Sequence, residues 1–229
     1  AGIGAGEAQA THVLMETLLV SGFSMAMAGT SAPASGAEHL ISHYWDMEEH
    51  GQDRPVRGLH GTQVGIGTRI SSRTLWKLMA LESADIMRAA QGAHERRPND
   101  LWIDELGQHH PDLTPGIIDE IQIQFRKKQR HGDDLQRELE TLGANWSQVR
   151  DELKSILIPT ERIDRALREA GCITRPSELR VDHDHLLRTI KTCRHIRARY
   201  VNFDLLDDLG LLDAMAEDIA SELEGESHV

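Results

Sequence analysis

The chain has 229 residues, a net charge of −12 and 39% hydrophobic residues. This is the composition of a folded globular protein that is long enough to bury a substantial core. The acidic balance argues against a nucleic-acid-binding protein, because such proteins usually carry a basic face. Two short basic clusters, at residues 126–132 and 194–199, are flanked by acidic residues, and we interpret them as solvated helix faces.

The cysteines and the most apolar segment bear on location. Cys172 and Cys193 form neither a CxxC motif nor a disulfide framework, so we expect reduced thiols and a cytoplasmic protein. The most apolar stretch, residues 13–29, contains Glu16, two serines and two glycines. It falls short of the roughly 20 apolar residues that a membrane span needs, so we predict no span.

Apolar residues recur every three or four positions along most of the chain, which predicts an all-α fold. In chain order, the first helix is expected over residues 6–28, tightly packed because it carries small residues such as Gly22. A second helix is expected over residues 35–48. A long third helix should run from about Leu59 to Ala93, where the polar, proline-containing stretch HERRPND ends it.

Shorter amphipathic helices are expected in the second half. One follows Thr114, with Pro115 at its first position, and the next ends at Gly143. A leucine-rich stripe over residues 205–223 predicts a C-terminal helix. No repeat or linker divides the chain, so we expect one all-α domain over residues 1–229, a bundle of about eight helices.

Three histidines stand in two short motifs that suit metal chemistry. In SAPASGAEHLISH, residues 31–43, Ser35 and Glu38 fit a capping box, which puts His39 in the first helical turn. His43 follows one turn further along the same face. His60 begins the next expected helix, in LHGTQVGIGT, after a polar loop. Neutral imidazole binds zinc, nickel or iron.

Spacing alone leaves two interpretations of these histidines open. They are metal ligands, as the i, i+4 pair or as His39 with His60, or they are ordinary polar residues in a chain with 13 histidines. Three glycines after His60 would each cost a helix roughly 1 kcal/mol, which indicates close approach by a ligand or, more commonly, by a neighbouring helix. The N-terminal AGIGAGE has no strand before it, so we interpret it as a helix entry and not as a dinucleotide loop.

Both histidine motifs, and RARYVNFDLLDDLGLLD near the C-terminus, closely resemble the helical C-terminal domain of the metal-dependent polyol dehydrogenases. That superfamily includes glycerol dehydrogenase, iron-containing alcohol dehydrogenases and 3-dehydroquinate synthase. The wording PASGAEHLISHYWDM is most similar to glycerol-1-phosphate dehydrogenases of the AraM-like bacterial kind. The resemblance covers essentially the whole chain.

The resemblance implies a cytoplasmic oxidoreductase of phospholipid metabolism that interconverts dihydroxyacetone phosphate and sn-glycerol 1-phosphate with NAD(P). In this family an aspartate and two histidines bind a divalent metal, usually zinc, with nickel or iron in some members. The histidine ligands match His39 and His60. His43 matches a family histidine near the site, to which we assign a catalytic, proton-handling role. The ion would act as a Lewis acid during hydride transfer.

Two departures from the family pattern shape what we expect of this chain. The N-terminal α/β domain that binds NAD(P) is absent, as is the aspartate ligand, expected shortly before residue 1, so the chain alone should be catalytically incomplete. Ala32 stands at a position where the matching motif of the family often has arginine. This difference weakens the case for a phosphate contact there.

Alternatives stay open at the level of sequence. One is another reaction on the same scaffold, either oxidation of an unphosphorylated polyol or dehydroquinate synthesis. Another is a non-catalytic helical domain that assembles with a partner and keeps its histidines for packing. A homo-oligomer is also left open.

Overall fold

The structure, a computed structural model, describes residues 1–225, and within them it contains helices and no strand. The all-α prediction is confirmed. The elements are α1 (Ala8–Ala28), η1 (Ala32–Ala34), α2 (Ala37–Gly51), α3 (His60–Leu78), α4 (Ser83–Gln91), α5 (Ala93–Arg96), η2 (Leu101–His109), α6 (Pro115–Arg126), α7 (Gly132–Ile156), α8 (Thr160–Glu169), η3 (Pro176–Leu179), α9 (His183–Thr192), η4 (Cys193–Ile196), α10 (Asn202–Asp208) and α11 (Leu212–Gly225), where η marks a 3-10 helix.

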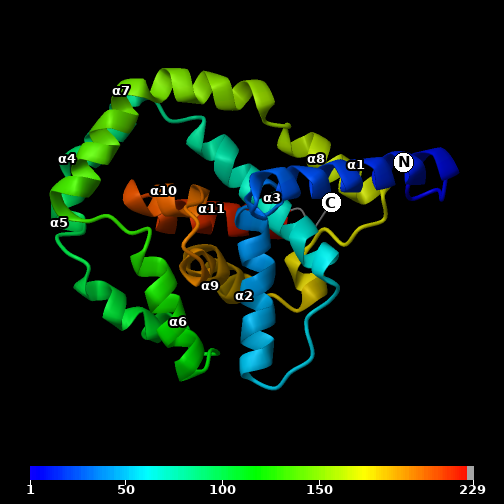
Figure 1. Cartoon of the computed structure of the whole chain (residues 1–229), viewed down its shortest axis with the longest axis horizontal. Coiled ribbons are helices and arrows are strands. Elements are labelled where there is room, and N and C mark those ends of the chain that lie inside the picture. The colour runs from blue at the N-terminus through cyan, green and yellow to red at the C-terminus, as the bar shows by residue number, and fades with distance from the viewer. Residues whose placement is uncertain (226–229) are drawn as a thin grey trace.

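The body is built around two helix pairs, α2 with α3 and α4 with α7, with α9 to α11 packed between them (Figure 1). Aromatic side chains form the largest fully buried part of the core, among them Tyr44, Trp45, Phe125, Trp146 and Phe203. The indole of Trp45 donates to Thr189 Oγ1 at 2.8 Å, which ties α2 to α9. The core therefore spans segments far apart in the sequence.

Two expected helix boundaries are wrong, each for a local reason. The long third helix is broken into α3 and α4, because Glu82 starts a new helix and its N–H donates to Asp85 Oδ2 at 2.9 Å. Conversely, α7 runs straight through Gly143. A Cβ at Gly143 would lie 2.5 Å from Met87 Sδ, so this glycine lets α4 approach α7 and does not end a helix.

The leucine-rich C-terminal stripe is divided between two helices. It runs through α10 and α11, and Gly210, at φ +72°, turns the chain between them. Both cysteines are free thiols, Cys172 exposed and Cys193 buried.

The two basic clusters are partly buried, so their interpretation as solvated faces is wrong. Lys128 Nζ lies 2.8 Å from Asp204 Oδ2 and also donates to the backbone carbonyls of Arg194 and Arg199. Asp204 is 0% exposed and also pairs with Arg194. A buried carboxylate needs such partners, because an uncompensated charge in the core is strongly destabilising.

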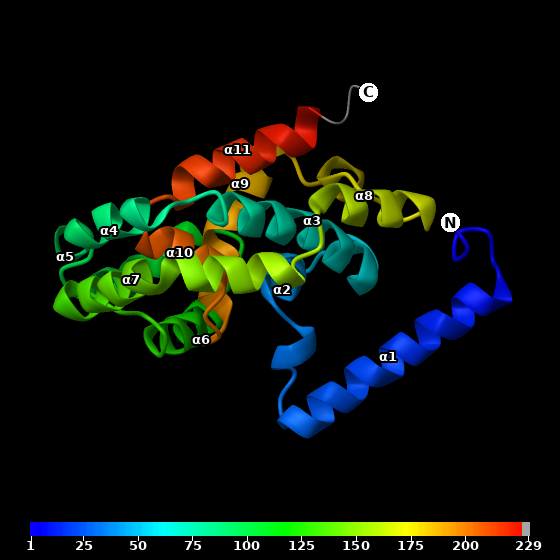
Figure 2. The same cartoon turned by 90° about the horizontal axis from the view of Figure 1, so that it is seen from above.

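Helix α1 projects away from the body (Figure 2). The helix itself was predicted, but its tight packing is wrong: none of its residues is buried, and a Cβ at Gly22 would meet nothing within 4 Å. Its exposed apolar side chains include Leu18, Leu19 and Phe23. Among the described residues α1 is also a helix long and apolar enough to cross a membrane by length and composition. Core helices of soluble proteins and signal sequences pass the same test, so the expected absence of a span stays a prediction.

A close approach of two backbones holds α2 against α3. A Cβ at Gly67 would lie 2.6 Å from the carbonyl oxygen of Glu38 and 3.0 Å from its Cα. Glycine at this position therefore lets the first turn of α2 rest directly on α3. By contrast, a Cβ at Gly61 would meet nothing within 4 Å, and one at Gly65 would meet only Leu167.

A buried histidine pair crosses the core near this helix pair. His110 Nδ1 lies 3.1 Å from the Tyr44 hydroxyl, and His110 Nε2 lies 3.0 Å from His195 Nδ1. Burial lowers the pKa of His110 to about 4 and that of His195 well below its ordinary value. Both rings are therefore neutral at neutral pH.

The chain should lose stability in mild acid because of these rings. A histidine whose pKa is lower in the folded state contributes stability that is present above pH 6.5 and is lost as the pH falls toward about 4. From His110 alone we expect the free energy of unfolding to drop by about 2 kcal/mol between pH 7 and pH 5. Urea denaturation at both pH values measures this drop. The His110→Gln variant should show a smaller one, and a wild-type stability that stays flat over this range would contradict the prediction.

Substitution of Gly67 should be costly, unlike substitution of its neighbour on α3. In Gly67→Ala the new methyl group must displace the backbone of α2, so we expect a loss of about 1–3 kcal/mol in the free energy of unfolding. Gly61→Ala is the matched control and should cause no loss, because the space around it is open. Equal stability of the two variants in thermal or chemical denaturation would show that the α2–α3 approach is not tight.

Candidate metal centre

The structure brings His39, His43 and His60 together, as the sequence motifs predict. The ring centroids of His39 and His60 are 5.2 Å apart, those of His43 and His60 are 5.5 Å apart, and those of His39 and His43 are 6.2 Å apart. Two rings come from the first two turns of α2, and the third comes from the first residue of α3. The α2–α3 approach at Gly67 therefore places the cluster.

The capping arrangement at the start of α2 differs from the predicted one. The N-cap is Gly36 and not Ser35, and the Glu38 carboxylate accepts the Gly36 N–H at 2.7 Å. The same carboxylate lies 2.8 Å from His39 Nδ1. Because a carboxylate only accepts hydrogen bonds, Nδ1 of His39 must be the protonated nitrogen. In the neutral ring, Nε2 then carries the free lone pair.

A buried relay orients His60 in the same way. The Asp46 carboxylate accepts from the Gln63 amide nitrogen at 2.9 Å, so the amide oxygen of Gln63 faces the other way and accepts from Ser42 Oγ at 2.6 Å. The hydrogen of the Ser42 hydroxyl is used in that bond, so the hydroxyl oxygen accepts from His60 Nδ1 at 2.9 Å. Nε2 of His60 is therefore also left with its lone pair.

This relay was not predicted from the sequence. Ser42 and Gln63 are both 0% exposed. Their spacing of three residues from His39 and from His60 is compatible with a shared helix face, but only the pairing of α2 with α3 brings the two side chains together. Partners of this kind fix the ring orientation and tautomer of histidines that bind metals.

His43 is held neutral by its surroundings. Burial lowers its pKa, and the nearby His60, Arg197 and His39 lower it further, while Asp46 acts in the opposite direction. A neutral imidazole at this place can accept a proton or offer a lone pair.

The cluster fits a divalent metal in the chemistry of its donors, but it is incomplete. His39 and His60 each have Nδ1 engaged in a hydrogen bond, which leaves Nε2 as the nitrogen that would bind zinc. Across residues 1–225, no group of three or more His, Cys, Asp or Glu side chains is already arranged to hold a metal ion. A third protein ligand for these two histidines is not supplied by the described residues.

The chain is similar in sequence to several curated proteins. It is 30% identical over 212 residues to a glycerol-1-phosphate dehydrogenase [NAD(P)+] of Geobacillus stearothermophilus, covering 90% of this chain and 41% of that protein. Proteins of the same name from Geobacillus thermodenitrificans and Methanothrix thermoacetophila are 45% identical over 82 residues and 35% identical over 109 residues. These matches cover 34% and 46% of this chain, and 20% and 29% of the two relatives.

No protein-family profile and no solved structure matches the chain. The match to the Geobacillus stearothermophilus protein covers 90% of the chain, while the chain spans less than half the length of each of these relatives. The chain is therefore related in sequence to the glycerol-1-phosphate dehydrogenases, of which it matches a part.

Proposed function

We propose that this chain is the metal-binding helical part of an NAD(P)-dependent enzyme that interconverts dihydroxyacetone phosphate and sn-glycerol 1-phosphate. The observation that carries the proposal is the histidine pair His39 and His60, in which each ring has Nδ1 engaged in a hydrogen bond and Nε2 left over for a metal. Their rings lie 5.2 Å apart in a chain similar to glycerol-1-phosphate dehydrogenases over 90% of its length.

In this proposal His39 and His60 bind a divalent metal, which is zinc by the donor chemistry, with nickel or iron as alternatives. When bound, the metal supplies Lewis-acid stabilisation of negative charge on the substrate oxygen. His43 lies beside both ligands, and its surroundings lower its pKa, so it accepts the proton when the alcohol is oxidised and returns it when the ketone is reduced.

An arginine pair beside the cluster suits a phosphorylated substrate. Arg197 is exposed and close enough to lower the pKa of His43. Arg199 donates to Ser31 Oγ at 3.4 Å, next to Ala32, the position at which the resemblance implies an arginine. Arginine binds phosphate in a planar, bidentate geometry. We therefore assign the substrate phosphate to Arg197 and Arg199, which replace the arginine missing at position 32.

The proposal leaves the cofactor to a part of the enzyme outside this chain. NAD(P) is expected to bind an α/β domain such as the one that the resemblance implies, so the chain alone should be catalytically incomplete, and the complete enzyme should be cytoplasmic. The exposed apolar side chains of α1 support assembly with another polypeptide or a second copy. The alternative is a non-catalytic assembly domain. An absence of histidine-dependent zinc binding in the titrations described below would favour it.

Zinc binding by the 229-residue chain should depend on both proposed ligands. Two histidines hold zinc weakly, and we expect His39→Ala or His60→Ala to reduce the affinity by at least about tenfold. Isothermal titration with zinc chloride measures this, with His50→Ala as the control, because His50 is an exposed histidine on the same helix. Unchanged binding in both ligand variants would refute the assignment.

Removing the relay should weaken the metal site without touching a ligand. In Ser42→Ala, His60 Nδ1 loses its acceptor, and the tautomer with a free Nε2 is no longer enforced. Loss of such a partner typically costs 10–100-fold in metal affinity. The same titration measures this change, and circular dichroism checks that the helices are retained. An affinity equal to that of the wild type would show that the relay serves packing alone.

A chimera tests the activity itself. In it, this chain replaces the matching 41% of the Geobacillus stearothermophilus protein, and the rate of dihydroxyacetone phosphate reduction by NAD(P)H is measured. We expect an active chimera, a loss of at least about 100-fold in kcat with His60→Ala, and an increase in KM with little change in kcat for Arg197→Gln. A folded chimera that binds zinc but prefers unphosphorylated glycerol would reject the proposed substrate.

A further inference from the structure

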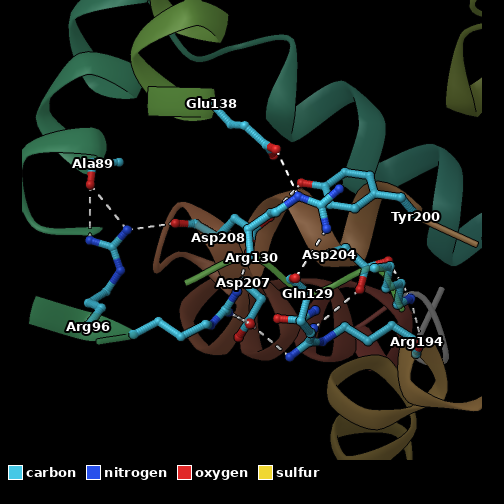
Figure 3. A network of polar contacts seen from close by, with 12 residues as sticks. Ala89, Arg96, Gln129, Arg130, Glu138, Arg194, Tyr200, Asp204, Asp207 and Asp208 are labelled. Atoms are coloured by element: carbon cyan, nitrogen blue, oxygen red, sulfur yellow. Dashed lines mark hydrogen bonds and ion pairs between the residues drawn. The ribbon is translucent and has the colours of Figure 1, made fainter. Parts of the chain in front are cut away.

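A cavity lies where α5, η2, η4 and α10 meet. None of His39, His43 and His60 lines it. Its volume is about 470 Å³, which is within the range of small-molecule sites. Trp102, Leu106 and Leu135 give it an apolar wall, and Arg96, Arg97 and Arg194 give it a polar one. Figure 3 shows part of that polar wall, with Arg96 of α5, Asp207 of α10 and Arg194 of η4.

The cavity is positive although the chain carries a net charge of −12. Its lining holds four cations and two carboxylates, namely Arg96, Arg97, Lys191 and Arg194 against Asp207 and Asp213. The carboxylates behind the lining do not reverse this balance. With Asp204, Asp208 and Lys128 included, there are five cations and four carboxylates.

Arg96 is the cation with the least compensation. Its hydrogen bonds within the described residues go to backbone carbonyls, those of Ala89 at 3.1 Å and Asp208 at 2.6 Å (Figure 3). Burial and the neighbouring Arg97 lower the pKa of its guanidinium, while Asp207 and Asp208 raise it. Gly210 makes room for it, because a Cβ there would lie 3.1 Å from Arg96 Cδ. Arg96 is exposed and has no carboxylate partner among the described residues, so its guanidinium is available to an anion in the cavity.

Two buried ring nitrogens beside the cavity, Trp102 Nε1 and His195 Nε2, have no hydrogen-bond partner among residues 1–225. The other three indoles of the chain donate to Thr189 Oγ1, to the Ile158 carbonyl and to the Leu81 carbonyl. An indole nitrogen is a donor only, and a buried donor without an acceptor costs about 1–3 kcal/mol. Such unsatisfied groups next to a cationic cavity indicate a missing acceptor.

We propose that this cavity binds a small organic phosphate, with the phosphate held by Arg96 and Lys191 and hydrogen-bonded by Trp102 Nε1 and His195 Nε2. The apolar wall then contacts the organic part of the ligand. This site is separate from the His39–His60 cluster and does not depend on the function proposed for it.

The histidine pair in the core lets His195 serve as a donor. If the Tyr44 hydroxyl donates to His110 Nδ1, then His110 Nε2 donates to His195 Nδ1, and the proton of His195 sits on Nε2. The reverse direction would leave a lone pair on Nε2 facing the anion. A bound phosphate therefore favours the arrangement in which Tyr44 donates to His110, His110 donates to His195, and His195 Nε2 donates to the phosphate.

The test uses inorganic phosphate and the four indole N–H signals of the ¹⁵N-labelled chain. Phosphate is titrated at constant ionic strength, set with sodium chloride, and the Trp102 signal is assigned with Trp102→Phe. We expect the Trp102 signal to shift in a saturable way, while the signals of Trp45, Trp76 and Trp146 stay in place, because those three indoles already have acceptors.

Variants locate the binding. Arg96→Gln and Lys191→Gln should each weaken phosphate binding by at least about tenfold, since each removes a charged partner. The exposed Arg88→Gln serves as a control for surface charge, and His60→Ala as a control for binding at the other site, and both should leave the affinity unchanged. No saturable shift of the Trp102 signal, or equal affinities in Lys191→Gln and Arg88→Gln, would overturn the proposal.

Discussion

The candidate metal centre depends on one steric constraint, the contact between the backbone of α2 at Glu38 and Gly67 of α3. A side chain at position 67 would push the first turn of α2 away from α3. The rings of His39 and His60 belong to these two helices and are 5.2 Å apart. The Ser42–His60 and Ser42–Gln63 hydrogen bonds also cross this interface. Ring placement and tautomer thus share one origin, and a change that opened the interface would disturb both together.

The relay illustrates how a helix pair can prepare a site before any ligand arrives. Asp46 has only acceptors, so it sets the direction of every hydrogen bond from Gln63 through Ser42 to His60. Glu38 has the same effect on His39. Because these directions are imposed by carboxylates and not by a metal, the chain should hold both Nε2 lone pairs in place in the absence of metal. That reduces the reorganisation that binding requires.

Local sequence patterns predicted the helices better than they predicted the boundaries between them. The three-to-four-residue apolar spacing identified α1, α2 and α6 with small errors at their ends. Gly143 was misassigned because a glycine that ends a helix and a glycine that admits Met87 from a neighbouring helix have the same local context. For Gly67 the sequence left open whether a ligand or a neighbouring helix approaches it, and in the fold it is the neighbouring helix α2. Only the partner helix distinguishes the two cases, and it lies dozens of residues away.

The two basic clusters show that local sequence also fails to predict which charged residues are buried. The sequences of RKKQRHG and RHIRAR look like those of solvated helix faces, so they do not indicate which basic residues are buried. In the fold, Lys128 and Arg194 are 6% and 3% exposed, and both pair with Asp204, which is fully buried. Asp204 stands 76 residues after Lys128, so no local pattern links them. Burying these charges is costly unless each is matched, and the matching is nearly complete around Asp204. The nearby Arg96 is exposed, and its hydrogen bonds go to backbone carbonyls and not to a carboxylate. Its charge is therefore open to an anion in the adjoining cavity, whereas Lys128 and Arg194 are already paired with Asp204.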